Sequence, residues 1–244
     1  MMDALSPRQQ QILELVDRVG FVTIEALAES FKVSAQTIRR EIITLDSKGI
    51  LQRFHGGAGR ANGTDKLRLG HEYKSQQEHL EKEIIAKQVT QHIASGDTLY
   101  IDVGTTMERV AQELNKFDQL TILTNSILVA TKFDHARHSV NVLGGEIAGQ
   151  DGSLVGEQAV QQLRNLRLDH ALIGCSAIEP DGSVMDFDQR KIAIKQAAKS
   201  VSRHSYLLAS QHKFGRTAFA RICHMDEFTT VISNTGKGII TATG

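Results

Sequence analysis

The chain has 244 residues, with 28 basic and 28 acidic side chains and a hydrophobic fraction of 41%. This composition is that of a globular protein long enough for two modest domains, and it excludes a disordered chain. The apolar runs are far shorter than the ~20 residues of a membrane-spanning helix, and we expect no secretory signal. The cysteines, Cys175 and Cys223, provide neither a disulfide framework nor a zinc-ligand spacing. We therefore expect a cytoplasmic protein.

Zero net charge argues against a nucleic-acid partner only if the basic residues are spread evenly along the chain. Their distribution is uneven. Residues 32–60 contain six basic and two acidic side chains, a local excess of +4, which leaves −4 for the rest of the chain. This segment therefore has the local basic character that a DNA-binding surface needs.

Three short helices are predicted in the first part of the chain. Ser6, Thr23 and Ser34 are suitable N-caps, because a hydroxyl oxygen accepts a hydrogen bond from a free N–H group of the first helical turn. Apolar residues at helical spacing follow each cap, and a hairpin with a glycine turn is predicted over residues 50–57. The apolar residues are Ile12, Leu15, Val16 and Val19 in the first helix, Ile24, Leu27 and Ala28 in the second, and Ile38, Ile42 and Leu45 in the third.

The tight connection before the third helix is typical of helix-turn-helix units, which place their later helix in the major groove of DNA. With the apolar stripe of this helix buried, its polar residues and Ile43 face outward, where Arg and Gln can pair with base edges and hydroxyl groups with phosphates. A three-helix bundle that binds protein rather than DNA is the alternative. The candidate DNA contacts are Ser34, Gln36, Thr37, Arg39 and Arg40 on the helix, and Arg53 and His55 in the hairpin.

The remainder of the chain is expected to form an α/β domain with a mainly parallel sheet, because short β-rich apolar runs alternate with helical segments. The full architecture is then a winged helix-turn-helix followed by a Rossmann-like domain. We place the DNA-binding domain at residues 1–58, a linker at 59–74 and the second domain at 75–244. A capping box at Ser75–Glu78 is predicted to open a long helix, whose apolar stripe is Leu80, Ile84, Ile85, Val89 and Ile93.

The sheet is predicted from six apolar runs and the helices from the segments between them. Helices are expected at Met107–Leu114, Glu157–Leu166 and Gln189–Ser202. The expected strands are Thr98–Val103, Leu120–Leu123, Val140–Leu143, Ala171–Ile173, Tyr206–Ala209 and Thr229–Ile232.

Glycine, hydroxyl and amide residues follow several of the predicted strands. They stand in Asp102–Thr106, Thr124–Ser126, Gly144–Gly145 and Gly174–Ala177. Strand ends on one edge of a parallel sheet are the usual ligand site in such folds, and free N–H groups at a helix start suit an anion. Each segment alone is explained as well by ordinary turn and cap chemistry, but together they favour a binding site.

Two segments of the chain carry a resemblance to a known family. They are Val33-Ser-Ala-Gln-Thr-Ile-Arg-Arg-Glu-Ile42 and Arg53-Phe-His-Gly-Gly-Ala58. Both resemble the DeoR family of bacterial sugar-metabolism repressors, and within it the repressors of the glycerol-3-phosphate and sulfoquinovose pathways. Glu41 replaces the usual Asp of the family pattern, which keeps a carboxylate able to orient an arginine.

The resemblance implies a second domain that is similar to ribose-5-phosphate isomerase and binds a phosphorylated sugar as inducer. It assigns effector binding to the strand-end motifs and to two lysines able to neutralise an anionic group. Departures from the family pattern at Ile147-Ala148, Lys191, Gln196, Ser210 and His212 are predicted to cluster in the pocket and to suit a ligand other than a simple sugar phosphate. The implied effector-binding residues are Asp102, Gly104, Thr105, Thr106, Thr124, Asn125, Gly144, Gly145, Lys195 and Lys213.

The predicted function is a ligand-responsive, DNA-binding transcriptional regulator, a repressor of a sugar or sugar-derivative catabolic operon. Its expected partners are double-stranded operator DNA and a small anionic sugar metabolite, and a homodimer or homotetramer would match two half-sites. No cofactor is expected, and no metal, since His135 and His138 lack a further ligand at suitable spacing. A non-enzyme is expected; the alternative is a sugar-phosphate isomerase with an accessory helical domain, using Asp102 and Lys195.

Overall fold

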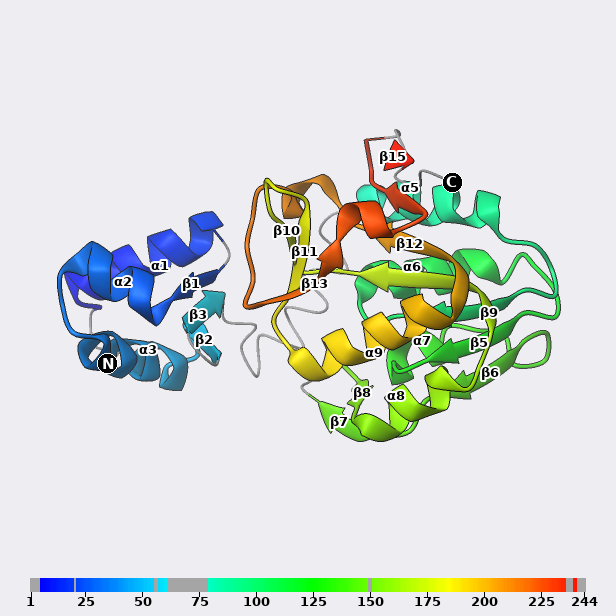
Figure 1. Ribbon diagram of the computed structural model, residues 1–244, viewed down its shortest axis with the longest axis horizontal. Coiled ribbons are helices and arrows are strands. Elements are labelled where there is room, and N and C mark those ends of the chain that lie inside the picture. The colour runs from blue at the N-terminus through cyan, green and yellow to red at the C-terminus, as the bar shows by residue number, and fades with distance from the viewer. Residues whose placement is uncertain are drawn as a thin grey trace.

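The computed structural model describes residues 5–19, 21–54, 57–60, 79–148, 151–235 and 239–240, which form two units of unequal size (Figure 1). The smaller, N-terminal unit combines three helices with a three-stranded antiparallel sheet in the order β1-β3-β2. Its helices are α1 (Pro7–Val19), α2 (Ile24–Phe31) and α3 (Ala35–Ser47), and its strands are β1 (Phe21–Thr23), β2 (Leu51–Phe54) and β3 (Gly57–Arg60).

The three predicted helices and their N-caps are confirmed. The side-chain oxygen of Ser6 accepts a hydrogen bond from the N–H of Gln9, and that of Thr23 accepts one from Ala26. The apolar stripes of the three helices meet in one small core, in which the following side chains are buried: Ile12, Val16, Ile24, Leu27, Ile38, Ile42, Leu45, Leu51 and Ala58. This core holds α3 with one face toward the other helices and the opposite face exposed.

The sheet of this unit extends beyond the predicted hairpin. Strand β1 was not predicted, because three residues are too few to show an alternating pattern, and it pairs with β3 so that Phe21 lies opposite Gly59. Strand β3 continues to Arg60, two residues beyond the predicted end of the domain. The rest of the predicted linker and the capping box at Ser75–Glu78 lie outside the described residues.

The larger unit is built on a seven-stranded sheet in the order β15-β14-β12-β9-β4-β5-β6. All neighbouring strands are parallel except β15 (Ile239–Ile240), which runs antiparallel to β14 at one edge. The prediction of a mainly parallel sheet is therefore confirmed. The parallel strands are β4 (Thr98–Ile101), β5 (Thr121–Thr124), β6 (Ser139–Val142), β9 (Leu168–Gly174), β12 (Ser202–Leu208) and β14 (Thr230–Ile232).

Helices cover both faces of this sheet, as the sequence predicted. Along β4, Tyr100 belongs to one buried core, while Leu99 and Ile101 belong to the other. The first core includes side chains of α8 (Glu157–Arg164) and α9 (Gln189–Val201). The second includes side chains of α5 (His79–Val89), α6 (Thr105–Leu114) and α7 (Ile127–Ala130).

The predicted apolar stripe of α5 is partly wrong. Leu80 and Ile84 are 76% and 41% exposed. The buried stripe is formed instead by Lys82, Ile85, Ala86 and Val89, because the helix is rotated so that a lysine, rather than the two apolar residues, faces inward. A short 3-10 helix, η1 (Thr90–His92), follows α5.

Two smaller sheets lie beside the main one and were not predicted. Strands β7 (Glu146–Ala148) and β8 (Ser153–Val155) form an antiparallel hairpin. Strands β10 (Ala177–Ile178), β11 (Ser183–Asp186) and β13 (Ala220–His224) form a three-stranded sheet. Two further 3-10 helices are η2 (Gln211–Lys213) and η3 (Met225–Glu227). In the described part of the chain, no helix is both long and apolar enough to cross a membrane.

Replacing Ile42 by alanine should destabilise the N-terminal unit by ~2–5 kcal/mol, because a fully buried side chain leaves a cavity. Ile43→Ala is the matched control: this neighbouring residue on the same helix is 47% exposed, and its truncation should change stability by less than ~0.5 kcal/mol. Urea unfolding of both variants measures the difference. Equal losses in the two variants would contradict the packing of α3 described above.

Candidate DNA-binding and effector sites

The exposed face of α3 carries the predicted DNA-contacting side chains. Ser34 caps the helix by accepting a hydrogen bond from the N–H of Thr37, and the two hydroxyl oxygens lie 2.9 Å apart. Gln36, Arg39 and Arg40 are exposed, whereas the apolar stripe on the opposite face is fully buried. The predicted rotation of the helix is therefore confirmed, including the outward direction of Ile43.

The basic groups of α3 are separate from the ion pair that holds the helix. Glu41 pairs with Arg8 of α1, with 2.5 Å between Oε1 and Nη2 and 3.1 Å between Oε1 and Nε. In the described ranges, neither Arg39 nor Arg40 has an ion-pair partner. The carboxylate that departs from the family pattern thus joins two helices, while both arginines of the outer face stay available to an anionic partner.

The hairpin is positioned against the same helix. The N–H of Arg53 on β2 donates a hydrogen bond to Oδ1 of Asp46 near the end of α3, at 3.0 Å, and the Arg53 side chain is exposed. His55 lies outside the described residues. Gly57 cannot carry a side chain, because a Cβ would come within 2.4 Å of the Phe21 ring.

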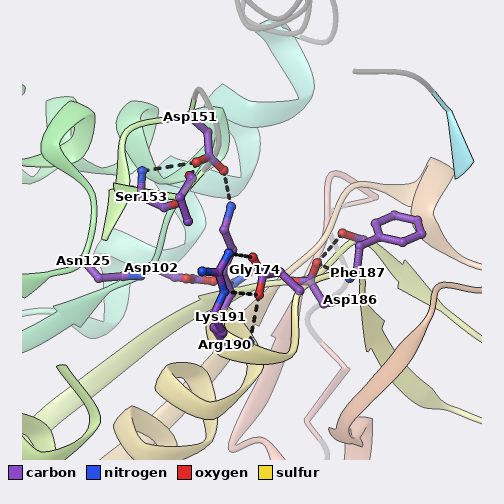
Figure 2. Close-up of polar contacts among 12 residues, drawn as sticks. Asp102, Asn125, Asp151, Ser153, Gly174, Asp186, Phe187, Arg190 and Lys191 are labelled. Carbon is purple, nitrogen blue, oxygen red and sulfur yellow. Dashed lines mark hydrogen bonds and ion pairs between the residues drawn. The ribbon is translucent and has the colours of Figure 1, made fainter. Parts of the chain in front are cut away.

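At the other site, strand ends bring together residues that are far apart in the sequence. Asp102 follows β4, and its Oδ2 accepts a hydrogen bond from the N–H of Gly174 at the end of β9, at 3.0 Å. Asn125 follows β5, and its Oδ1 accepts one from the hydroxyl of Tyr100 at 2.9 Å. Figure 2 shows these groups around one point at the carboxyl edge of the sheet.

Lys195 of α9 lies at the centre of this group and is 3% exposed. Its Nζ lies 2.8 Å from Oδ2 of Asp102 and 2.8 Å from Oδ2 of Asp186, and it donates to the carbonyl oxygen of Gly174 at 2.8 Å. An ammonium group has three donors, so its hydrogen-bonding capacity is filled. Two carboxylates and one ammonium leave the cluster with a net charge of −1, which favours hydroxyl donors over anions as direct neighbours.

The charges in this cluster stabilise one another. Burial works against the charged form of Lys195, but the two neighbouring carboxylates raise its pKa above the ordinary value. Burial also works against ionisation of Asp186, yet the Lys195 ammonium and a hydrogen bond from Ser176 lower its pKa overall. Lys195 and Asp186 are therefore both ionised at neutral pH.

Asp186 was not predicted as a site residue. It is a single carboxylate at the end of an apolar strand, and no motif marked it. The one signal in the sequence was a charged side chain at the end of the mostly buried strand β11, a position where an acidic residue needs a partner.

The glycine and hydroxyl residues predicted for the effector site have distinct surroundings. Gly104 precedes α6 with a φ of +117°, and no side chain caps this helix, so Thr105 and Thr106 begin it with free backbone N–H groups. Thr124 is buried and accepts a hydrogen bond from the N–H of Ser126. Gly145 packs on β8, where a Cβ would come within 2.5 Å of a carbonyl oxygen.

Gly144 and Lys213 complete the predicted set. The N–H of Gly144 donates to Oε1 of Gln162 at 3.2 Å. Nζ of Lys213 donates to the carbonyl oxygen of Cys175 at 2.6 Å. Next to it, burial and then the charges of Lys213 and Arg216 lower the pKa of His212 to about 4. Cationic side chains therefore gather around η2.

The hairpin of β7 and β8 is joined to the start of α9 by two ion pairs. Nζ of Lys191 lies 2.5 Å from Oδ2 of Asp151 (Figure 2). Nη1 of Arg190 lies 3.7 Å from Oε2 of Glu146. Burial opposes ionisation of Asp151, but Lys191 lowers its pKa overall. The lysine that departs from the family pattern thus has a carboxylate partner in the hairpin.

The departures do not all lie together, which corrects the prediction that they cluster in one pocket. Ser210 is buried between β12 and η2, and His212 lies on η2. Gln196, however, donates to the carbonyl oxygen of Ile222 on β13 at 2.6 Å, and Ile147 is 61% exposed. Helical and strand periodicity turns these two side chains away from the strand-end cluster.

With both sites described, comparison with known proteins identifies the family. Residues 8–64 match the model of the DeoR-like helix-turn-helix domain, and residues 77–235 match that of the DeoR C terminal sensor domain. The chain belongs to the DeoR family. It is 38% identical to the glycerol-3-phosphate regulon repressor of Escherichia coli over 216 residues, which is 88% of this chain and 85% of the relative.

Other members of the DeoR family are similar over comparable lengths. The E. coli HTH-type transcriptional repressor CsqR is 34% identical, covering 94% of this chain and 87% of the relative. The lactose phosphotransferase system repressor of Staphylococcus aureus is 35% identical, covering 92% and 90%. The predicted class, a DNA-binding transcriptional repressor with a sensor domain, is confirmed.

One solved structure shows a similar fold, and a second is a weaker match. The beta subunit of eIF2B from Chaetomium thermophilum matches with a TM-score of 0.51 at 13% identity, covering 85% of this chain and 56% of that one. Ribose 5-phosphate isomerase from Plasmodium falciparum matches with a TM-score of 0.41 at 14% identity, covering 57% and 54%.

Replacing Lys195 by methionine should destabilise the larger unit by ~3–5 kcal/mol at neutral pH, because it leaves two buried carboxylates without their cation. A carboxylate whose pKa is lowered by folding stabilises the folded state at pH values above its unfolded-state pKa. This stabilisation is lost as the pH falls through the folded-state pKa. The difference between wild type and Lys195→Met should therefore shrink below pH ~4.

Lys191→Met is the control for this prediction, since its ion pair with Asp151 is more exposed and should contribute ~1 kcal/mol or less. Urea unfolding between pH 3 and pH 8 measures both variants. A loss in Lys195→Met that is equally large at every pH would contradict the electrostatic account.

Proposed function

We propose that this chain represses a catabolic operon for a sugar or sugar derivative and leaves its operator when a phosphorylated or otherwise anionic sugar metabolite binds the sensor domain. The observation that carries the proposal is the exposed basic face of α3 in a chain that also holds a buried polar cluster at the strand ends. Operator binding by such a regulator takes place in the cytoplasm.

DNA recognition is assigned to α3 and the hairpin. Arg40 and Gln36 lie at the centre of the exposed face and are proposed to contact base edges in the major groove. Ser34, Thr37, Arg39 and Arg53 flank them and are proposed to contact phosphates, together with His55. Because operators of symmetric regulators contain two half-sites, we propose a homodimer or homotetramer as the active form.

Effector recognition is assigned to the strand-end cluster. The carboxylate of Asp102 and the amide of Asn125 suit the hydroxyl groups of a sugar, since carboxylate oxygens only accept hydrogen bonds. The anionic substituent is proposed to lie near Lys213 and the free N–H groups of Thr105 and Thr106 at the start of α6, where charge and helix dipole both favour it. Thr124, Gly144 and Gly145 shape the backbone around this position.

A sugar-phosphate isomerase remains the second candidate, favoured by the buried pair of Asp102 and Lys195. The three engaged donors of Lys195 support a structural role for this lysine instead. A coupled isomerase assay separates the two: turnover that is lost in Asp102→Asn would establish an enzyme.

Arg40→Ala should weaken binding to operator DNA by ~1–3 kcal/mol, which is about 5- to 150-fold, because a base contact is lost. Binding to unrelated DNA should change far less. Arg18→Ala, an exposed arginine at the end of α1, is the control. Mobility-shift titrations with DNA upstream of the gene and of neighbouring sugar operons measure the effect. If the wild-type protein binds none of these fragments, the proposed function is wrong.

Thermal shift with a panel of sugars, sugar phosphates and sugar acids should show stabilisation by an anionic member and none by neutral sugars. Lys213→Met should weaken that ligand about tenfold or more, because a cation near the anionic group is removed. Lys87→Met, on the exposed side of α5, is the control and should leave the affinity unchanged. Equal stabilisation by neutral and anionic sugars would contradict the assignment.

A further inference from the structure

The two units of the chain meet through three aromatic rings. Phe21 of β1 in the N-terminal unit lies 5.7 Å from the ring of Phe187 and 6.1 Å from that of Phe219, measured between ring centroids. The interplanar angles of 56° and 67° are those of tilted and edge-on pairs, which are favourable aromatic arrangements. Phe21 is only 3% exposed, so this contact buries a side chain of the DNA-binding unit against the sensor unit.

On the DNA-binding side, Phe21 is rigidly connected to the recognition helix. It stands two residues before Thr23, the N-cap of α2, and its ring fills the space that Gly57 leaves open on β3. Helices α2 and α3 share the small core of this unit. A shift of Phe21 relative to the sensor unit therefore carries α3 with it.

On the sensor side, Phe187 is bonded to the strand-end cluster. Its backbone N–H donates to Oδ1 of Asp186 at 2.8 Å, while Oδ2 of the same carboxylate lies 2.8 Å from Nζ of Lys195. That ammonium in turn contacts Asp102. Figure 2 shows the Phe187 ring pointing away from the cluster, so its backbone faces the site and its side chain faces the N-terminal unit.

The carboxylate of Asp186 therefore belongs to the strand-end cluster and also contacts the backbone of Phe187. Asp186 is buried, and each of its oxygens has a partner: Oδ2 faces Lys195, and Oδ1 accepts from Ser176 and from Phe187. A ligand that engages Asp102 or Asp186 competes with these contacts in a region of low dielectric, where a change of partner has a large energetic effect. Phe187, the residue next to Asp186, is directly connected to such a change because its N–H is one of those partners.

We propose that Phe187 is the positioning residue that couples the effector site to the DNA-binding unit. Ligand binding at the cluster of Asp102, Lys195 and Asp186 moves the Phe187 ring against Phe21 and thereby changes the placement of α3. This inference rests on the proposed effector site and specifies how effector binding is transmitted to the DNA-binding unit. The aromatic contact then has two arrangements, and the equilibrium between them depends on both the effector and the operator DNA.

A tryptophan reporter tests the movement without DNA. The chain contains no tryptophan, so Phe187→Trp introduces a single indole at the contact, and Phe117→Trp introduces one in the partly buried position after α6, away from it. The probe is the sugar derivative that gives the largest thermal shift with wild type. Its saturation should change the emission maximum or anisotropy of Phe187→Trp and leave that of Phe117→Trp unchanged. Unchanged emission from Phe187→Trp at saturation overturns the proposal.

Operator titrations with and without the same probe test the coupling itself. Coupling factors of roughly 5- to 150-fold are typical of allosteric proteins. In Phe187→Ala this factor should fall below about threefold, while the affinity for the probe, measured by thermal shift, stays within about twofold of wild type. Phe187→Trp should restore most of the factor.

Phe219→Ala is the matched control, because it removes a ring that also contacts Phe21 but whose own peptide N–H is not bonded to Asp186. It should retain most of the coupling factor.

If wild type binds the operator but no member of the panel releases it, the proposed function fails and the coupling with it. If wild type is released and Phe187→Ala is released equally well, the function stands and the role of Phe187 is wrong.

Discussion

The larger unit is organised around one buried ammonium group. Lys195 lies between Asp102 and Asp186, and each of these three residues comes from a different element: α9, the end of β4 and the end of β11. Burying any one of these charges alone would be strongly unfavourable, so the fold must bring all three together. The same requirement fixes where β4, β9 and α9 meet, and it places a polar, negatively charged cluster at the edge of the sheet where ligands of parallel folds bind.

The N-terminal unit is stabilised by a small apolar core together with polar interactions between its helices. Its core is small, and helix caps together with the ion pair of Arg8 and Glu41 supply the polar interactions that fix α1, α2 and α3. Using a carboxylate of α3 to bind α1 leaves the arginines of the outer face unpaired within the described ranges. A local excess of +4 on a neutral chain gives a weak general attraction to DNA, so most of the discrimination must come from base contacts and from the geometry of the oligomer.

The connection between the units depends on residues that neither site contains. Phe21 belongs to a strand of three residues, and Phe187 to the turn between β11 and α9. Each would be an ordinary apolar residue by itself. Their contact matters because Phe187 shares a hydrogen bond with Asp186, so packing between the units and electrostatics in the sensor unit meet at one peptide group.

Much of this protein was determined by local sequence. Hydroxyl caps, helical spacing of apolar residues and β-rich runs predicted the three N-terminal helices, the outer face of α3 and the alternating strands of the parallel sheet, because each depends on neighbours within a few residues. The same patterns placed Asp102 and Asn125 at strand ends. They could not show that Lys195 uses all its donors internally, that Asp186 completes the cluster, or that Gln196 turns away. Nor could they show that Lys82, rather than Leu80, faces the core. These properties depend on which elements pack together, and partners dozens of residues apart are chosen by burial and charge only in the folded chain.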